Sequence, residues 1–205
     1  MNPAAAATAA SAIFSGASLI GTSAQKMSQA INTWRNVTIQ ISNYSKNYTL
    51  EEPKIYTCSG YCHNPPQPTI KQNTLEVCSF SKTANTACGA VGVLTYQIIN
   101  NENQCIGKLA IMFSVPYNYN HYKNWFALGL FESGCSCDKE LYRKMYYDEL
   151  DTFKRAIGTG NSITHSNDSF LLKGTMSPLG QSVIKVEFWE KPVAGVKKQP
   201  ENDQQ

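Results

Sequence analysis

The chain has 205 residues, of which 42% are hydrophobic and 16% are charged, and its formal net charge is +3. This balance excludes a wholly disordered chain. It holds no run of 18 consecutive apolar residues, so a constitutive membrane helix is not expected. A charge this small and scattered does not indicate a nucleic-acid partner.

The first 32 residues are expected to form a separate segment. Residues 1–10 are alanine-rich and are expected to be mobile, and an apolar stripe at helical spacing follows. The members of the stripe are Ile13, Ala17, Ile20, Ala24, Met27 and Ile31. The opposite face carries hydroxyl and amide side chains, with Lys26 as its only full charge. Such a face is less costly near lipid than a charged one.

After Trp34 the hydrophobic period changes from 3.6 to 2, because Val37, Ile39 and Ile41 alternate with polar residues. Further strands are predicted at residues 74–81, 90–99, 108–115, 125–131, 169–175 and 182–189, separated by turn-forming clusters. Many short strands without alternating helices favour a mainly β fold, an antiparallel sandwich over residues 33–190.

One more helix is predicted at residues 138–147. Asp138 can cap its N-terminus, and Leu141 and Met145 lie four residues apart and can dock on a sheet. Tyr142 and Tyr146 share the adjoining face. Residues 191–205 are mostly polar and are expected to form a disordered tail.

The seven cysteines do not fit a secreted disulfide framework, because their number is odd. Reduced, mostly buried thiols are expected instead. The spacing of Cys135 and Cys137 is too tight for zinc, and Cys58 and Cys62 have no second ligand pair, so no metal and no cofactor is predicted. No basic residue precedes Lys26, so the soluble form is expected to be cytoplasmic or exported without a clear signal peptide.

Two tyrosine-rich stretches, residues 113–126 and 142–147, carry the chemistry of the chain. Several tyrosine faces around a pocket attract a quaternary ammonium, and nearby hydroxyls can hold a phosphate. The residues therefore suggest a phosphocholine site. The alternative is that many of these tyrosines are structural, as is common in sandwiches. No nucleophile or phosphate-loop motif indicates an enzyme.

The chain resembles the actinoporins, the pore-forming cytolysins of sea anemones, and more closely the actinoporin-like proteins of other animals such as fish. The resemblance covers about residues 13–188. Its motifs are Gly89-Ala90-Val91-Gly92, the run from Phe113 to Asn120 and Met145-Tyr146-Tyr147. It implies a β-sandwich of ten or more strands flanked by two short helices. It also implies binding to phosphocholine lipids, preferentially sphingomyelin, by a protein that is monomeric in solution and oligomeric on the membrane.

The resemblance assigns residues one by one. The implied phosphocholine site consists of Ser59, Val91, Ser114, Pro116, Tyr122, Tyr142, Tyr146 and Tyr147. The implied exposed aromatics that rest on the bilayer are Tyr119, His121, Trp125 and Phe126, together with Tyr122. His121 replaces a family tryptophan, which predicts membrane contact that depends on mildly acidic pH.

Residues 13–31 would form a helix about 28 Å long, close to the roughly 30 Å of a hydrocarbon core. A single copy would lie at the interface, whereas several copies around water can turn their polar faces inward. The sequence therefore predicts a cation-permeable pore of weak charge selectivity, formed by insertion of this helix. The alternative is a lectin-like or lipid-headgroup-binding sandwich that never inserts.

Overall fold

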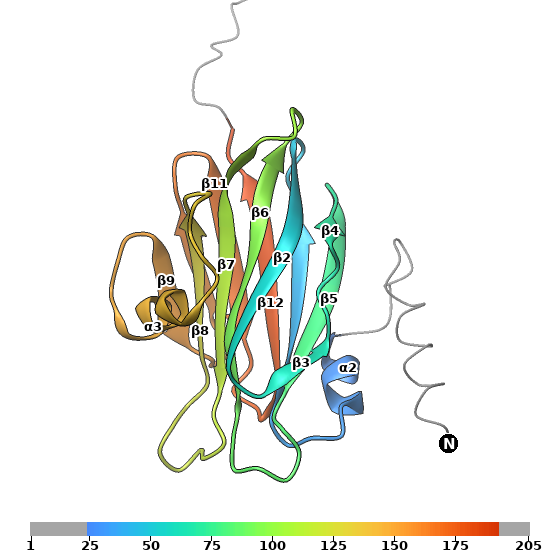
Figure 1. Ribbon diagram of the computed structural model, residues 1–205, viewed down its shortest axis with the longest axis vertical. Coiled ribbons are helices and arrows are strands. Elements are labelled where there is room, and N and C mark those ends of the chain that lie inside the picture. Colours follow the sequence, from blue (N-terminus) through green and yellow to red (C-terminus); the bar gives the residue numbers. More distant parts are fainter. Residues whose placement is uncertain (1–23, 193–205) are drawn as a thin grey trace, which may run out of the picture.

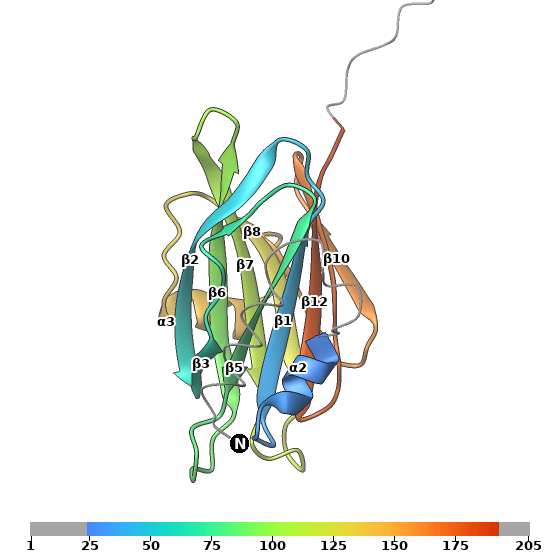
Figure 2. The same cartoon turned by 90° about the vertical axis from the view of Figure 1, so that its right-hand side faces the viewer.

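The computed structural model describes residues 24–192 as two six-stranded sheets packed face to face (Figure 1). One helix lies on the outer face of each sheet (Figure 2). The predicted β-sandwich of ten or more strands, flanked by two short helices, is confirmed. Among the described residues, no helix combines the length and the hydropathy that a membrane crossing requires.

The first sheet contains both the first and the last strand of the sandwich. Its order is β10 (Ser162–Ser166), β11 (Phe170–Met176), β12 (Gln181–Glu190), β1 (Asn36–Asn43), β5 (Thr74–Ser81) and β3 (Tyr61–Asn64). The strands pair antiparallel except β1 and β12, which run parallel at the centre. Val37, Ile39 and Ile41 of β1 all point into the core, as their alternation predicts.

The second sheet is antiparallel throughout and is covered on both faces. Its order is β4 (Thr69–Ile70), β2 (Tyr48–Ser59), β6 (Ala90–Asn100), β7 (Cys105–Val115), β8 (Trp125–Phe131) and β9 (Phe153–Ile157). Alternate residues of β6, β7 and β8 enter the central core, where Phe80 and Phe113 lie 4.4 Å apart between ring centroids. The remaining residues, such as Val93 and Met112, enter a second apolar cluster beneath a helix.

The seven predicted strands are present, and five strands were not predicted. The strand that departs most from an alternating pattern is β2, which contains Glu51, Glu52, Pro53 and Lys54 in succession. Its register shifts between Glu51 and Lys54, and Glu52 has a φ of 48°. A β-bulge of this kind interrupts the period-2 signal that marks a strand in a sequence. The others, β3, β4, β9 and β10, are five residues long or shorter.

Helix α3 (Lys139–Tyr147) begins where the sequence predicts. Both oxygen–nitrogen distances of its cap are 3.0 Å, because Asp138 Oδ1 accepts from the amides of Glu140 and Leu141. Leu141 and Met145 are buried against the second sheet. The capping bonds satisfy two of the free N–H groups of the first turn and fix where the helix starts.

Helix α2 (Ala24–Ala30) lies on β1 and β12. Of the apolar stripe, Ala24 and Ile31 are buried and Met27 is half-buried, whereas Ile13, Ala17 and Ile20 lie outside the described residues. Ser28 is a polar residue outside the apolar stripe, yet it lies on the side of the helix that faces the sandwich. Ser28 is fully buried, because its hydroxyl donates to Asn36 Oδ1 at 2.6 Å and to the carbonyl of Ser182 at 3.3 Å.

The cysteines are less buried than predicted. All seven are free thiols, but only Cys78 is buried; Cys58 is exposed and the other five are half-buried. The expectation of mostly buried thiols is therefore wrong. Cys62 packs against the central core, and Cys135 and Cys137 pack against the apolar cluster beneath α3.

Candidate functional site

The loop that carries four of the predicted site residues, 116–124, lies at one end of the sandwich together with two other connections. The β5–β6 loop (82–89) and the β7–β8 loop (116–124) both emerge there, at the lower end of the view in Figure 1. The β2–β3 turn reaches the same end through Gly60, which has a φ of 84° and lies against the carbonyl of Ser81. A side chain at Gly60 would be strained by this conformation and would also collide with that carbonyl, so the turn requires glycine.

A row of tyrosine rings runs from the second sheet along α3 towards solvent. The rings of Tyr56 and Tyr142 are 6.4 Å apart, those of Tyr142 and Tyr146 are 5.7 Å apart, and those of Tyr146 and Tyr147 are 4.8 Å apart. Exposure increases along the helix, from 7% for Tyr142 to 66% for Tyr147. The row therefore opens to solvent at its Tyr147 end.

Helix α3 positions these rings because two adjoining faces of it have different contacts. Leu141 and Met145 anchor the helix on the sheet, and Tyr142 and Tyr146, each one residue further on, lie beside that apolar contact. Arg155 of β9 donates a hydrogen bond to the carbonyl of Tyr146, near the end of the helix. Its guanidinium also lies 5.4 Å from the centroid of the Trp125 ring, so Arg155 connects α3 with the start of β8.

Residues of adjacent strands lie beside the tyrosine row. The registers pair Ser59 with Val91, Val91 with Ser114 and Ser114 with Trp125, so the four stand in one line across the sheet. The Ser59 hydroxyl donates to the carbonyl of Gly89 at 3.2 Å. The structure thus brings together residues that are far apart in the sequence.

Two tyrosine hydroxyls of the row, those of Tyr142 and Tyr146, have a pKa above the ordinary value. Burial raises the pKa of Tyr142 above its ordinary value, and the neighbouring Cys58 and Tyr146 raise it further. Burial also raises the pKa of Tyr146, although a hydrogen bond with Ser114 partly opposes the rise. At neutral pH both side chains therefore keep a proton that can be donated to an anionic oxygen.

The β7–β8 loop begins at the half-buried Pro116, and Tyr122 lies within it. Tyr122 is 60% exposed, and its backbone amide donates to the carbonyl of Asn118 at 3.1 Å. It lies close enough to Tyr146 to raise the pKa of that residue slightly. The ring of His121 is exposed beside it, at 6.4 Å between centroids.

The other aromatics expected on the bilayer surface are placed differently. Phe126 is completely buried in the central core, so the expectation that its ring is exposed is wrong. Adjacent residues of a strand face opposite sides, and Trp125 takes the outer position, where it is half-buried. Tyr119 is also half-buried, and its hydroxyl donates to Asn124 Oδ1 at 2.6 Å.

Two contributors to this end of the molecule were not predicted from the sequence. Tyr56 extends the tyrosine row, but it lies in β2, the bulged strand without a clear pattern. Arg155 joins Trp125 to α3 from β9, another strand that was not predicted.

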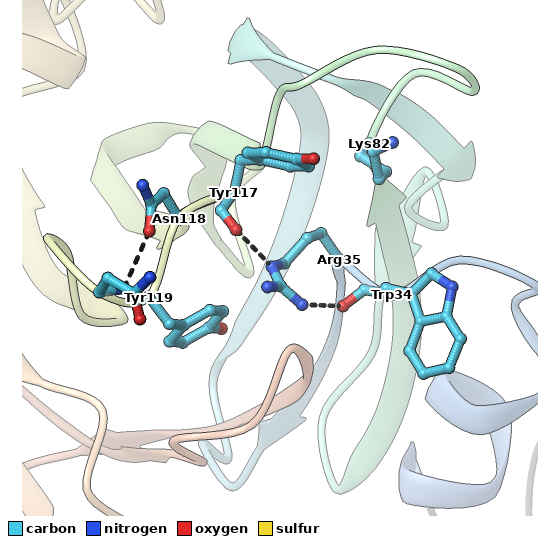
Figure 3. A pocket seen from close by; sticks show the side chains of 7 residues that line it. Trp34, Arg35, Lys82, Tyr117, Asn118 and Tyr119 are labelled. Atoms are coloured by element: carbon cyan, nitrogen blue, oxygen red, sulfur yellow. Dashed lines mark hydrogen bonds between the residues drawn. The ribbon is translucent and has the colours of Figure 1, made fainter.

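A separate cavity of about 660 Å³ lies on the other side of the β7–β8 loop (Figure 3). It is lined by Trp34, Arg35, Lys82, Tyr117, Asn118, Tyr119 and Asn120. Trp34 precedes β1 and is 84% exposed, and Lys82 follows β5 directly. None of the residues that line this cavity was among the predicted headgroup ligands.

Comparison with known proteins places the chain in a family. The model of the family described as sea anemone cytotoxic protein matches residues 8–189. Conoporin-Cn1 of Conus consors is 30% identical over 179 residues, which cover 83% of this chain and 68% of the relative. Tereporin-Ca1 of Terebra anilis is 27% identical over 186 residues, covering 85% of this chain and 94% of the relative.

The match to the sea anemone proteins themselves is shorter. Cytolysin tenebrosin-B of Actinia tenebrosa is 30% identical over 103 residues, so this chain covers 43% of that relative. Among solved structures, the lipid binding protein Nakanori has a TM-score of 0.59 at 12% identity, covering 82% of this chain and 77% of that one. At this identity the likeness shows the fold alone.

The family match covers the sandwich and both described helices, and the resemblance inferred from the aromatic motifs is confirmed. Its members are pore-forming cytolysins and not enzymes. The chain therefore belongs to the sea anemone cytotoxic protein family, the actinoporins.

Proposed function

We propose that this protein is a pore-forming cytolysin that binds the phosphocholine headgroup of sphingomyelin or another choline lipid on a target-cell membrane. The observation that carries the proposal is the tyrosine row that ends at the exposed Tyr147, with Ser114 and Tyr122 beside Tyr146. A quaternary ammonium on a tyrosine face gains about 0.5–1 kcal/mol when exposed and about 2 kcal/mol when desolvated.

The phosphate of the same headgroup would be held by hydroxyl donors. Tyr146 and Tyr142 are protonated at neutral pH, as any tyrosine is, and burial raises their pKa values further. Ser114 shares a hydrogen bond with Tyr146. Hydrogen bonds from neutral hydroxyls to an anionic oxygen are stronger than those between neutral groups. Ser59, Val91 and Pro116 would shape the strand side of the site, and Tyr122 would close it from the loop.

Bilayer contact would be made by the end of the sandwich where Tyr122, His121 and Trp34 are exposed. Half-buried Trp125 and Tyr119 would support this surface from behind, because each ring packs on a cation, Arg155 and Arg35 respectively. Tyrosine and tryptophan are well suited to this place, since each pairs an apolar ring with a polar group.

The leading segment would supply the pore. The soluble monomer would bind lipid first and then oligomerise, and the apolar stripe of residues 13–31 would enter the bilayer with its polar face turned to a water-filled lumen. Insertion would depend on assembly, because the polar face of a lone helix has no favourable partner in lipid. The resulting pore would be cation-permeable with weak charge selectivity.

Experiments with lipid vesicles distinguish headgroup binding from pore formation, the two steps of this proposal. We expect the wild-type protein to bind sphingomyelin-containing vesicles and to release an entrapped dye. Tyr146→Leu should weaken both binding and release, whereas Ile20→Glu should leave binding intact and abolish release, since a charge on the lipid face is costly. The matched control is Tyr44→Leu, which removes an exposed ring at the opposite end of β1.

The same experiment distinguishes a sandwich that binds and never inserts. Vesicle binding without dye release by the wild-type protein would favour that alternative. Binding that is equal on vesicles with and without choline lipids would contradict the proposed headgroup site.

A further inference from the structure

The separate cavity differs from the tyrosine row because positively charged side chains line it (Figure 3). Its lining residues are Trp34, Arg35, Lys82 and residues 117–120. Two of the residues that line it are cationic and none is acidic. Both cations contact Tyr117: Arg35 Nε donates to its carbonyl at 3.0 Å, and the Lys82 ammonium lies 5.8 Å from its ring centroid. The β7–β8 loop thus holds two positive charges at one recess.

The guanidinium of Arg35 is fixed before any ligand arrives. Besides the bond from Nε, its Nη1 donates to the carbonyl of Trp34 at 2.8 Å, and its carbon lies 4.4 Å from the centroid of the Tyr119 ring. A guanidinium has five N–H donors, so these two bonds leave three. Both carbonyl partners are neutral, and the positive charge is therefore not cancelled by the groups that orient it.

The ligand that fits such a recess is a tetrahedral oxyanion. Arginine and lysine are the side chains that most often hold phosphate, the first through several directed N–H groups and the second as a compact charge. A side chain that is already oriented loses less conformational entropy when it binds. The Asn118 side chain lies at the same recess, where its Oδ1 accepts from the Asn120 amide and leaves its amide nitrogen to donate.

We propose that this recess binds the phosphate of an anionic lipid headgroup, as a second lipid site beside the tyrosine row. That the bound phosphate belongs to a lipid rests on the proposed function, because the recess opens at the same end of the sandwich as the exposed Tyr122. Trp34 and Tyr117 flank it with 84% and 49% of their surfaces exposed. The binding of an oxyanion as such does not depend on that function.

Lys82 and Lys71 provide a matched pair of variants. Lys82 directly follows the last residue of β5, and Lys71 lies three residues before its first, so the two lysines stand near opposite ends of one strand. Lys82→Gln and Lys71→Gln change the net charge equally, but only the first changes the recess. Lys82→Arg restores the charge and tests whether the position needs a cation.

The first measurement uses inorganic phosphate and the full-length ¹⁵N-labelled protein, titrated at constant ionic strength. We expect the indole signal of Trp34 and the amide signals of residues 117–120 to shift in the wild type and in Lys71→Gln. The dissociation constant should rise about tenfold in Lys82→Gln and recover in Lys82→Arg. No saturable shift at these residues, or equal titration of both glutamine variants, overturns the proposal.

The second measurement uses phosphatidylcholine vesicles with and without phosphatidylglycerol. We expect the anionic lipid to strengthen binding of the wild type and of Lys71→Gln, and to strengthen binding of Lys82→Gln much less. If phosphate titrates as expected but phosphatidylglycerol strengthens binding of Lys82→Gln and Lys71→Gln equally, the recess does not bind a lipid phosphate. Its ligand is then a soluble phosphate. If the wild-type protein binds neither phosphatidylcholine vesicles nor sphingomyelin-containing vesicles, while phosphate titrates as expected, the proposed function is contradicted and this site is not.

Discussion

Tyr146 offers a way to separate the two halves of headgroup recognition, because its hydroxyl and its ring can be removed in turn. Tyr146→Phe should weaken binding of phosphocholine vesicles at least about tenfold, because one hydrogen bond to a charged group contributes roughly 1.5–3 kcal/mol. Tyr146→Leu should weaken it about tenfold further, since the ring face is lost as well. Surface plasmon resonance on captured vesicles measures both. Equal loss in the two variants would mean that the ring does not contact the cation.

His165 predicts how stability depends on pH. It is buried on β10, and this burial lowers its pKa below the ordinary value of 6.5. The unfolded chain therefore takes up a proton at a higher pH than the folded chain does, and the free energy of unfolding should fall as pH drops through about 6.5. His165→Gln should show a flatter profile in urea unfolding between about pH 7 and about pH 5. A wild-type profile no steeper than that of the variant would contradict this assignment.

At the same scale, the sequence predicted residue types more reliably than residue positions. The family resemblance implied that the tyrosines of α3 and Ser114 of β7 share one site, and the structure brings Tyr146 beside Ser114. The sequence could not show which of Trp125 and Phe126 is buried, since both are aromatic. Adjacent residues of a strand face opposite sides, and the orientation of β8 in the sheet decides which one enters the core. The recess of Arg35 and Lys82 depends on three loops, and loop geometry follows from tertiary contacts that no local pattern encodes.

Among the elements, α2 raises the question of how the leading segment leaves the sandwich. Its buried contact includes a polar pair beside the apolar Ala24: Ser28 donates to Asn36 Oδ1, and Asn36 Nδ2 donates back to the Ser28 carbonyl at 3.2 Å. A further bond from Asn36 Nδ2 reaches the carbonyl of Thr33 at 3.2 Å. Undocking of α2 would expose these groups to water, which can replace every one of these hydrogen bonds, so the contact is specific without being irreversible.

Ser28→Ala should loosen this contact. The variant leaves the Asn36 oxygen without its donor, at a cost of about 2 kcal/mol, which corresponds to roughly thirtyfold faster local opening. Hydrogen exchange of a peptide covering residues 24–31, followed by mass spectrometry, measures that rate. Gln29→Ala on the exposed side of the same helix is the control. Unchanged exchange in Ser28→Ala would mean that apolar contacts of Ala24 and Ile31 hold the helix.

Element boundaries were predicted best where capping and periodicity agreed. For α3, the Asp138 cap and the pair Leu141 and Met145 both indicated the same helix, and the structure contains it. For β2, four consecutive charged or proline residues concealed a strand of 12 residues. That strand exists because β4 and β6 pair with it on either side, a stabilisation that comes from the sheet and not from its own sequence.

For the whole molecule, the proposed pore can be tested by its electrical behaviour. The polar face of residues 13–31 has Lys26 as its only full charge, so an assembly of such helices has no ring of carboxylates to attract cations. In a planar bilayer with a potassium chloride gradient, we expect a reversal potential close to zero. A potential near the potassium equilibrium value would show strong cation selectivity and would contradict the arrangement.

The bond between Ser28 and Ser182 joins residues 154 positions apart, and β1 pairs with β12 across nearly the same interval. During translation, the surface of β1 and β12 on which α2 packs is therefore incomplete until β12 has left the ribosome. Long-range pairing of this kind also folds slowly. The nascent chain consequently spends most of its synthesis with α2 undocked from the sandwich.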